Sequence, residues 1–118
     1  MGLAVDSIVS PGCIISGGRV NRSVLGPFVR VNSYCEIDES ILLPRATIGR
    51  YSRVRRAIIG EDVTLPENSR VGFDADEDRA LGRVVTESGI TVVPSPNSHT
   101  RMQESRVQAA SAAHPFGS

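Results

Sequence analysis

The 118-residue sequence predicts an all-β protein: a triangular parallel β-solenoid of about four coils, followed by a short helix and short strands. Three observations favour this fold. A 17-residue repeat fills the first part of the chain, and aliphatic residues recur within it at intervals of six, six and five. Aromatic residues make up only 4% of the chain, too few for a conventional aromatic-centred core. These intervals are not those of an α-helix and are typical of stacked triangular coils.

The repeat divides into segments that superpose column by column. Three 17-residue segments begin at Ser23, Ser40 and Ala57, and a 16-residue version begins at Ser7. Each side of a triangular coil contributes one inward aliphatic residue, so we expect nine buried positions in the three longer segments. These are Leu25, Val31, Ile37, Leu42, Ile48, Val54, Ile59, Leu65 and Val71.

Small residues and turn-forming residues occupy the remaining positions of each repeat. Small side chains are expected to point inward near the corners, where little volume remains, at Val29, Cys35, Ala46, Ser52, Val63 and Ser69. Glycines and prolines fall between the sides, where the chain must turn sharply, at Gly12, Gly26, Gly49, Gly60, Pro44 and Pro66.

The charged residues of the run Ser52–Arg56 have two interpretations. Residues 17 apart lie above one another, so each arginine of the third coil meets an acidic residue of a neighbouring coil. The expected pairs are Arg53 with Glu36, Arg55 with Asp38, Arg56 with Glu39, Arg50 with Glu67 and Arg45 with Asp62. The first interpretation is a ladder of exposed ion pairs, each worth about 0 to 1 kcal/mol. The second is an anion site formed by Arg50, Arg53, Arg55 and Arg56.

The repeat ends at Gly72. A short helix is expected between Asp74, as its N-cap, and Gly82, as its stop. Two short strands, 84–86 and 90–93, flank a turn and would pair or cover the last open coil. Residues 1–94 therefore form one domain, and residues 95–118, which contain both histidines, are expected to form a disordered tail.

Composition excludes several classes of protein. Thirteen basic residues balance thirteen acidic ones, so the chain has no net positive charge that would attract nucleic acid or an anionic membrane. All the basic residues are arginines, which excludes a Schiff-base or P-loop lysine. No apolar run is long enough to span a bilayer and no signal peptide is evident, so a cytoplasmic protein is expected. Cys13 and Cys35 lack a CxxC spacing and are expected to be reduced thiols.

The repeat resembles the left-handed β-helix of hexapeptide-repeat proteins. The runs DSIVSPGCIISGGRVNRSVL, VRVNSYCEIDESILLPRATIGRYSRVRRAIIGEDVTLPENSRVG, EDRALG and ESGITVVP further resemble the C-terminal domain of bacterial glucose-1-phosphate adenylyltransferase over about residues 5–94. In that family an N-terminal nucleotidyltransferase domain makes ADP-glucose from ATP and glucose 1-phosphate with Mg²⁺, for glycogen synthesis. The 118 residues contain no Gly-rich nucleotide-binding loop, catalytic lysine or metal-binding aspartate pair. We therefore expect no catalytic and no metal-binding residue in this chain, and we expect Mg²⁺ to bind only in the catalytic domain.

The resemblance implies a non-catalytic structural and regulatory domain. Its partners would be the catalytic domain and identical subunits, with a sugar-phosphate or nucleotide effector at Arg50, Arg53, Arg55 and Arg56. Basic residues that some relatives use for effectors correspond here to Glu61 and Ser95. A stand-alone hexapeptide acyltransferase and a purely self-associating solenoid remain alternatives. The acyltransferase would need a histidine beside a coil, and a carbonic anhydrase of this fold would need three.

Overall fold

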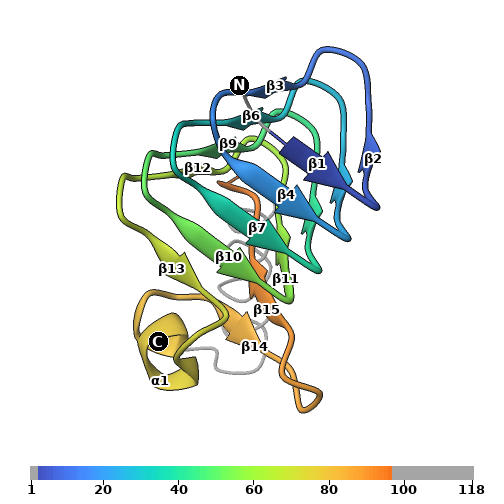
Figure 1. Cartoon of the computed structure of the whole chain (residues 1–118). Helices are drawn as coiled ribbons and strands as arrows, with labels where there is room; N and C mark the ends of the chain where they lie inside the picture. The colour runs from blue at the N-terminus through green and yellow to red at the C-terminus, as the bar shows by residue number, and fades with distance from the viewer. Residues whose placement is uncertain (1–2, 97–118) are drawn as a thin grey trace, which may run out of the picture.

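In the computed structural model, which describes residues 3–96, the chain winds into a triangular prism with a parallel sheet on each side (Figure 1). Sheet A contains β1 (Leu3–Val5), β4 (Arg19–Asn21), β7 (Glu36–Asp38), β10 (Arg53–Arg55) and β13 (Arg70–Val71). Sheet B contains β2 (Ile8–Val9), β5 (Val24–Leu25), β8 (Ile41–Leu42), β11 (Ala57–Ile59), β15 (Thr91–Val93) and β14 (Val84–Val85). Sheet C contains β3 (Ile14–Ile15), β6 (Arg30–Val31), β9 (Thr47–Ile48) and β12 (Thr64–Leu65). The predicted all-β solenoid of about four coils is confirmed, and its form is consistent with a left-handed β-helix.

The strand register follows the repeat. Arg53 pairs with Glu36 between β10 and β7, and Leu65 pairs with Ile48 between β12 and β9, so each step is 17 residues. In the first coil the step is 16 residues, as between Ile8 and Val24. The length of one repeat therefore equals one turn around the prism.

The core consists of the inward columns that the repeat predicts. All nine expected aliphatics are buried, none exposing more than 4% of its surface. The six small residues of the corner positions are buried as well, and Cys35 donates from Sγ to the carbonyl oxygen of Gly49 at 3.0 Å. Because successive coils place equivalent aliphatic side chains next to one another, the core is a set of aliphatic stacks rather than an aromatic cluster.

Gly12 and Pro44 lie in turns as predicted, Gly12 with a φ of 81°, but most corners turn on residues that the sequence did not mark. Ten non-glycine residues of the described chain have a left-handed backbone, with φ between 46° and 63°: Asp6, Arg22, Phe28, Tyr34, Glu39, Arg45, Tyr51, Arg56, Asp62 and Asn68.

Gly49 immediately precedes such a turn and is required for a different reason. A Cβ on Gly49 would lie 2.7 Å from the backbone nitrogen of Glu67 in the next coil, so the close approach of the coils, rather than a positive φ, selects glycine there.

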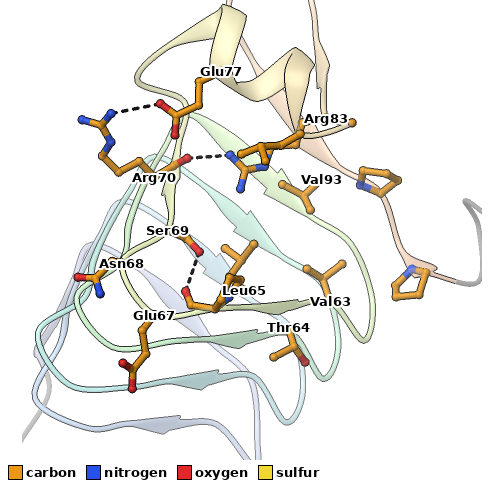
Figure 2. Close-up of a pocket in the computed structure, with 15 residues that line it drawn as sticks. Val63, Thr64, Leu65, Glu67, Asn68, Ser69, Arg70, Glu77, Arg83 and Val93 are labelled. Atoms are coloured by element: carbon orange, nitrogen blue, oxygen red, sulfur yellow. Dashed lines mark hydrogen bonds and ion pairs between the residues drawn. The ribbon is translucent and has the colours of Figure 1, made fainter.

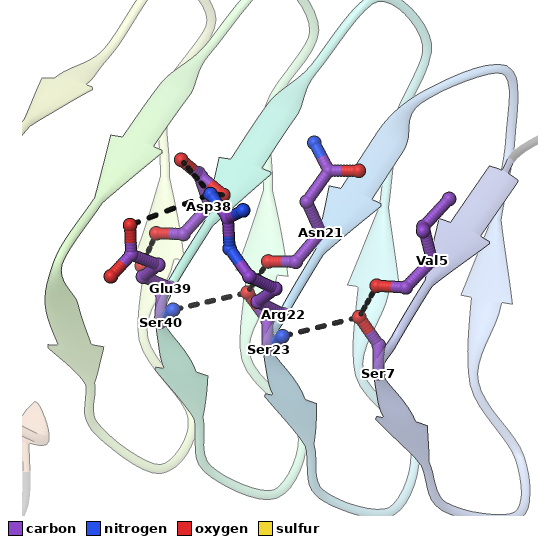
Figure 3. A network of polar contacts seen from close by, with 8 residues as sticks. All are labelled: Val5, Ser7, Asn21, Arg22, Ser23, Asp38, Glu39 and Ser40. Atoms are coloured by element: carbon purple, nitrogen blue, oxygen red, sulfur yellow. Dashed lines mark hydrogen bonds and ion pairs between the residues drawn. The ribbon is translucent and has the colours of Figure 1, made fainter.

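A ladder of serines holds the corner between sheets A and B (Figure 3). The hydroxyl of Ser23 donates to the carbonyl oxygen of Asn21 at 2.7 Å and accepts from the amide of Ser40 at 3.0 Å. Ser7 and Ser40 repeat this arrangement in the coils on either side, and the ladder ends at the amide of Ala57. These hydroxyls satisfy backbone groups at a corner where the sheet hydrogen bonds are interrupted.

Residues 73–96 cover part of the last coil. The predicted helix is α1 (Ala75–Ala80), capped by Asp74, whose carboxylate accepts from the amides of Asp76 and Glu77. The predicted strands are β14 and β15: they pair antiparallel with each other, and β15 adds to β11 as a fifth parallel strand of sheet B. The predicted tail of residues 95–118 lies outside the described residues from position 97 onward, and so do His99 and His114.

Candidate functional site

The four arginines predicted as an anion site do not form one cluster. Arg53, on β10, lies on the outer surface of sheet A with its Nε 3.4 Å from a carboxylate oxygen of Glu36. Arg50 lies in the turn between β9 and β10, and within residues 3–96 it forms no ion pair with Glu67. Arg55 and Arg56 lie instead at the far end of β10, next to the segment that covers the last coil.

Arg55 is held by an aromatic ring and a backbone carbonyl. Its guanidinium carbon lies 4.4 Å from the ring centroid of Phe73, and its Nε and Nη2 donate to the carbonyl oxygen of Gly72 at 3.4 and 3.3 Å. The strand register places Arg55 above Asp38, as expected. The predicted ion pair is nevertheless not formed, because Asp38 is 3.1 Å from Nη2 of Arg22.

Arg56 turns toward the β-hairpin that follows α1. Its Nη2 donates to the carbonyl oxygen of Ser88 at 2.9 Å, while Glu39, its expected partner, lies 3.5 Å from Arg22. The ion-pair ladder is therefore wrong for Arg50, Arg55 and Arg56. It is right for Arg53 and also for Arg45, whose Nε lies 2.7 Å from a carboxylate oxygen of Asp62.

Arg55 and Arg56 line the same hollow, which we call the Arg55–Arg56 hollow. It has a volume of about 440 Å³ and lies between the last coil, the start of α1 and the hairpin. Its lining is Arg55, Arg56, Gly72, Phe73, Ala75, Asp78, Val85, Gly89 and Thr91. Both guanidinium groups are exposed and have no carboxylate partner among the described residues, so they leave a positive charge at the hollow.

Asp78 in this lining is already neutralised. Its side chain is 2% exposed and lies 2.7 Å from the guanidinium of Arg83, which is 9% exposed. It also accepts from the amide of Gly72 at 3.2 Å and from the hydroxyl of Thr91 at 3.3 Å. In the sequence Asp78 looks like one of several acids in the first turn of a helix. Asp78 differs from the neighbouring acidic residues only in its position, four residues after the N-cap and on the face of α1 that is turned toward the last coil.

A second hollow, of about 530 Å³, lies over the edge of β12 (Figure 2). On sheet C, β12 is the outermost strand of the described chain, and its neighbour Pro66 has no amide proton to offer a further strand. Arg70 and Arg83 border this hollow, but Arg70 is 3.1 Å from Glu77, and Arg83 is bound to Asp78 and to the carbonyl oxygen of Arg70. Its cations are thus paired, unlike those of the Arg55–Arg56 hollow.

The remaining chemical groups do not assemble into a reactive site within the described residues. No three His, Cys, Asp or Glu side chains of residues 3–96 gather as metal ligands. Burial raises the pKa of the Cys35 thiol, which disfavours a reactive thiolate. Cys13 and Cys35 are both unpaired. The single helix of the described part, α1, is too short and too polar to cross a membrane.

Comparisons with known proteins agree on one family. Residues 1–93 match the family model described as GlmU-like, C-terminal hexapeptide. A glucose-1-phosphate adenylyltransferase from Koribacter versatilis is 54% identical over 93 residues, covering 79% of this chain and 22% of the relative. The corresponding enzymes of Rhodopirellula baltica and Bifidobacterium longum (strain DJO10A) are 50% and 52% identical, over 78% and 80% of this chain.

The chain therefore spans about a fifth of the length of the curated relatives that it matches. The match includes the coils, α1 and the strands that follow it, so the fold described above is the part that the relatives share. The chain belongs to the GlmU-like C-terminal hexapeptide family and is homologous to the C-terminal part of glucose-1-phosphate adenylyltransferase.

Proposed function

We propose that this chain is the non-catalytic structural and regulatory domain of a glucose-1-phosphate adenylyltransferase of glycogen biosynthesis. The observation that carries this proposal is the sequence identity of about 50% between this chain and roughly one fifth of the length of enzymes with that name. Nucleotidyl transfer needs a cradle for the triphosphate and carboxylates that hold Mg²⁺. No three metal-ligating side chains gather among residues 3–96, and we assign the binding of substrates and metal to the remainder of such an enzyme.

The partners follow from the same proposal. The domain would pack against the nucleotidyltransferase part of the enzyme, associate with identical subunits and work in the cytoplasm, where sugar nucleotides for polymer synthesis are made. No nucleic acid or membrane partner is proposed, since acidic and basic residues balance over the chain. The resemblance favours this role over the acyltransferase alternative.

The Arg55–Arg56 hollow is the best position for an anionic effector. It has room for a sugar phosphate or a nucleotide, and its two guanidinium groups carry donors not used by carboxylates. Arg55 is already oriented by the ring of Phe73, which reduces the entropy lost when an anion binds. Arg53 and Arg50 lie outside this hollow, so we assign them no direct contact with the effector.

Titration of the whole chain with a hexose bisphosphate and with AMP, followed by calorimetry and thermal unfolding, tests the effector site. We expect binding by the wild type and a loss of about tenfold or more in affinity for Arg55→Ala and Arg56→Ala. Arg30→Ala, at an exposed arginine on sheet C, is the matched control. Equal binding by all three variants would place the effector elsewhere.

A chimera tests the domain identity. Residues 1–94 replace the matching segment of the Koribacter versatilis relative, and pyrophosphate release from ATP and glucose 1-phosphate is measured for the chimera and for the 118-residue chain. We expect turnover only by the chimera. Turnover by the highly purified chain alone would contradict a non-catalytic role, and a stable, folded but inactive chimera would contradict the domain identity.

A further inference from the structure

The first repeat is one residue short at a single corner of the prism. The register between β3 and β6 advances by 16 residues, as from Ile15 to Val31, whereas between β4 and β7 it advances by 17, as from Arg19 to Glu36. The missing residue therefore lies in the corner that joins sheet C to sheet A (Figure 1). In the first coil only residues 16–18 turn this corner.

The next two coils place aromatic side chains at the same corner. Tyr34 and Tyr51 both have a left-handed backbone, and their rings stack with centroids 4.9 Å apart and planes 7° from parallel. Because this separation matches the spacing of the coils, about 4.8 Å, the ring faces point along the prism axis. Asn68 has the equivalent position in the fourth coil. The column of stacked side chains therefore begins at Tyr34.

The ring face of Tyr34 that points toward the first coil stays open among the described residues. Gly17 and Gly18 turn the corner there and offer no side chain to it. A Cβ added to Gly17 would have its three nearest atoms in Ser33, at 3.7 to 3.9 Å, and none of them in Tyr34. Tyr34 accordingly exposes 67% of its surface, against 55% for Tyr51.

Phe28, at another corner of the second coil, has a different environment. It also has a left-handed backbone, and it is 64% exposed. A Cβ added to Gly12 of the first coil would lie only 2.6 Å from Cε1 of Phe28, so this ring packs directly on the glycine of the coil before it. Phe28 is therefore a matched control for Tyr34: it is an exposed aromatic residue whose ring contacts the first coil.

A hydrogen-bond donor accompanies the open face. In the later coils the corner amides of Tyr51 and Asn68 donate to the carbonyl oxygens of Ser33 and Arg50, at 3.2 and 2.9 Å. The equivalent amide of Tyr34 has no acceptor within residues 3–96, because the shortened first corner does not supply one. The missing residue thus leaves both a ring face and an N–H donor without a partner in the described coils.

An aromatic face with hydrogen-bonding groups around it matches a pyranose ring. One face of a pyranose carries C–H groups that pack on an aromatic ring, and its rim carries hydroxyls that donate and accept. In the part of the chain that the structure describes, the hydroxyls of Ser16, Ser33 and Tyr34 form no hydrogen bond, so they are available to this rim. An aromatic side chain would leave these groups unused.

The charges beside the open face do not select an anion. The residues that directly follow the corner in the first and second coils, Arg19 and Glu36, are cross-strand neighbours of opposite sign. We propose that this corner, consisting of Ser16–Gly18, Ser33 and Tyr34 and called the Tyr34 shelf, binds a neutral oligosaccharide with one pyranose stacked on Tyr34. The sugar ring takes the place of the missing first member of the column.

The intrinsic fluorescence of the chain reports on this site, because its only two tyrosines are the stacked pair and it has no tryptophan. Titration with maltohexaose and with cellohexaose, followed by fluorescence and calorimetry, tests the shelf. We expect saturable binding of at least one of them at millimolar concentration. Tyr34→Ala should weaken this binding about tenfold or more, whereas Tyr34→Phe, which keeps the ring face, should retain it. Phe28→Ala should bind as the wild type does.

An insertion variant tests the role of the missing residue. One tyrosine inserted between Gly17 and Gly18 restores the 17-residue repeat and extends the column over Tyr34. We expect an unchanged circular dichroism spectrum and loss of saccharide binding. A wild type that binds neither saccharide, equal binding by Tyr34→Ala, or binding of adenosine in their place would overturn the proposal. Arg55→Ala and Arg56→Ala should leave saccharide binding unchanged, so this inference and the proposed effector site fail separately.

Discussion

Arg45 and Asp62 show how the coil spacing sets the chemistry of single residues. They lie 17 residues apart at the same corner position, and Nε of Arg45 donates to Oδ1 of Asp62 at 2.7 Å. This hydrogen bond and the guanidinium charge hold the pKa of Asp62 below its ordinary value and raise the pKa of Arg45. Both side chains remain substantially exposed, at 53 and 39%, so solvent screens the pair and its contribution to stability is small.

The stability contributed by Asp62 depends on pH in a defined direction. A carboxylate whose pKa is lowered in the folded protein stabilises it above the unfolded pKa of about 3.9, and this contribution is lost as the pH falls through the lower folded pKa. Asp62→Asn should therefore lower the Tm slightly at pH 7 and have no effect in strong acid. Thermal unfolding against pH measures this. Glu87→Gln, at an exposed acid, is the control, and an Asp62→Asn deficit that persisted in acid would contradict the assignment.

At the scale of elements, one buried carboxylate connects the covering segment to the coils. Asp78 of α1 joins the end of β13, through the amide of Gly72, to Arg83 before β14 and to Thr91 in β15. The same elements form the walls of the Arg55–Arg56 hollow. The shape of that hollow therefore depends on a side chain that does not itself present a free charge to it.

Loss of Asp78 should loosen this segment. Removal of one partner of a buried ion pair leaves the other charge uncompensated, at a cost of roughly 3–5 kcal/mol. We expect Asp78→Ala to lower the Tm markedly and to increase hydrogen exchange in β14 and β15 before the coils. Asp76→Ala, at a side chain that is 98% exposed, should change little. The double variant Asp78→Ala with Arg83→Met should lose less than the sum of the single losses, and strict additivity would argue against the pair.

At the scale of the whole molecule, stability comes from the repetition of the same contact. Each inward aliphatic packs on its equivalents in the coils above and below, so one substitution affects three coils. The same stacking opposes slippage, since a shift by one residue would turn an aliphatic column outward.

Ile48 lies in the middle of one such stack, between Val31 and Leu65. Ile48→Asp buries an unpaired charge and should cost about 5 kcal/mol, a large part of the stability of a domain of this size. We expect circular dichroism and thermal melting to show an unfolded chain. Thr47→Asp, at the neighbouring outward position of β9, should fold normally. A folded Ile48→Asp variant would mean that this column does not form the core.

The sequence by itself determined the solenoid, its register and its buried columns, because one repeat corresponds to one turn and residues a repeat apart must stack. It also determined α1 and the strands after it, whose cap and turn signals are local. Only the tertiary structure decided the partners of Arg55 and Arg56: long exposed side chains have several acceptors of similar energy, and the covering segment brought Phe73, Gly72 and Ser88 within reach. The same holds for Asp78, whose three partners belong to separate elements and converge only when that segment closes on the last coil.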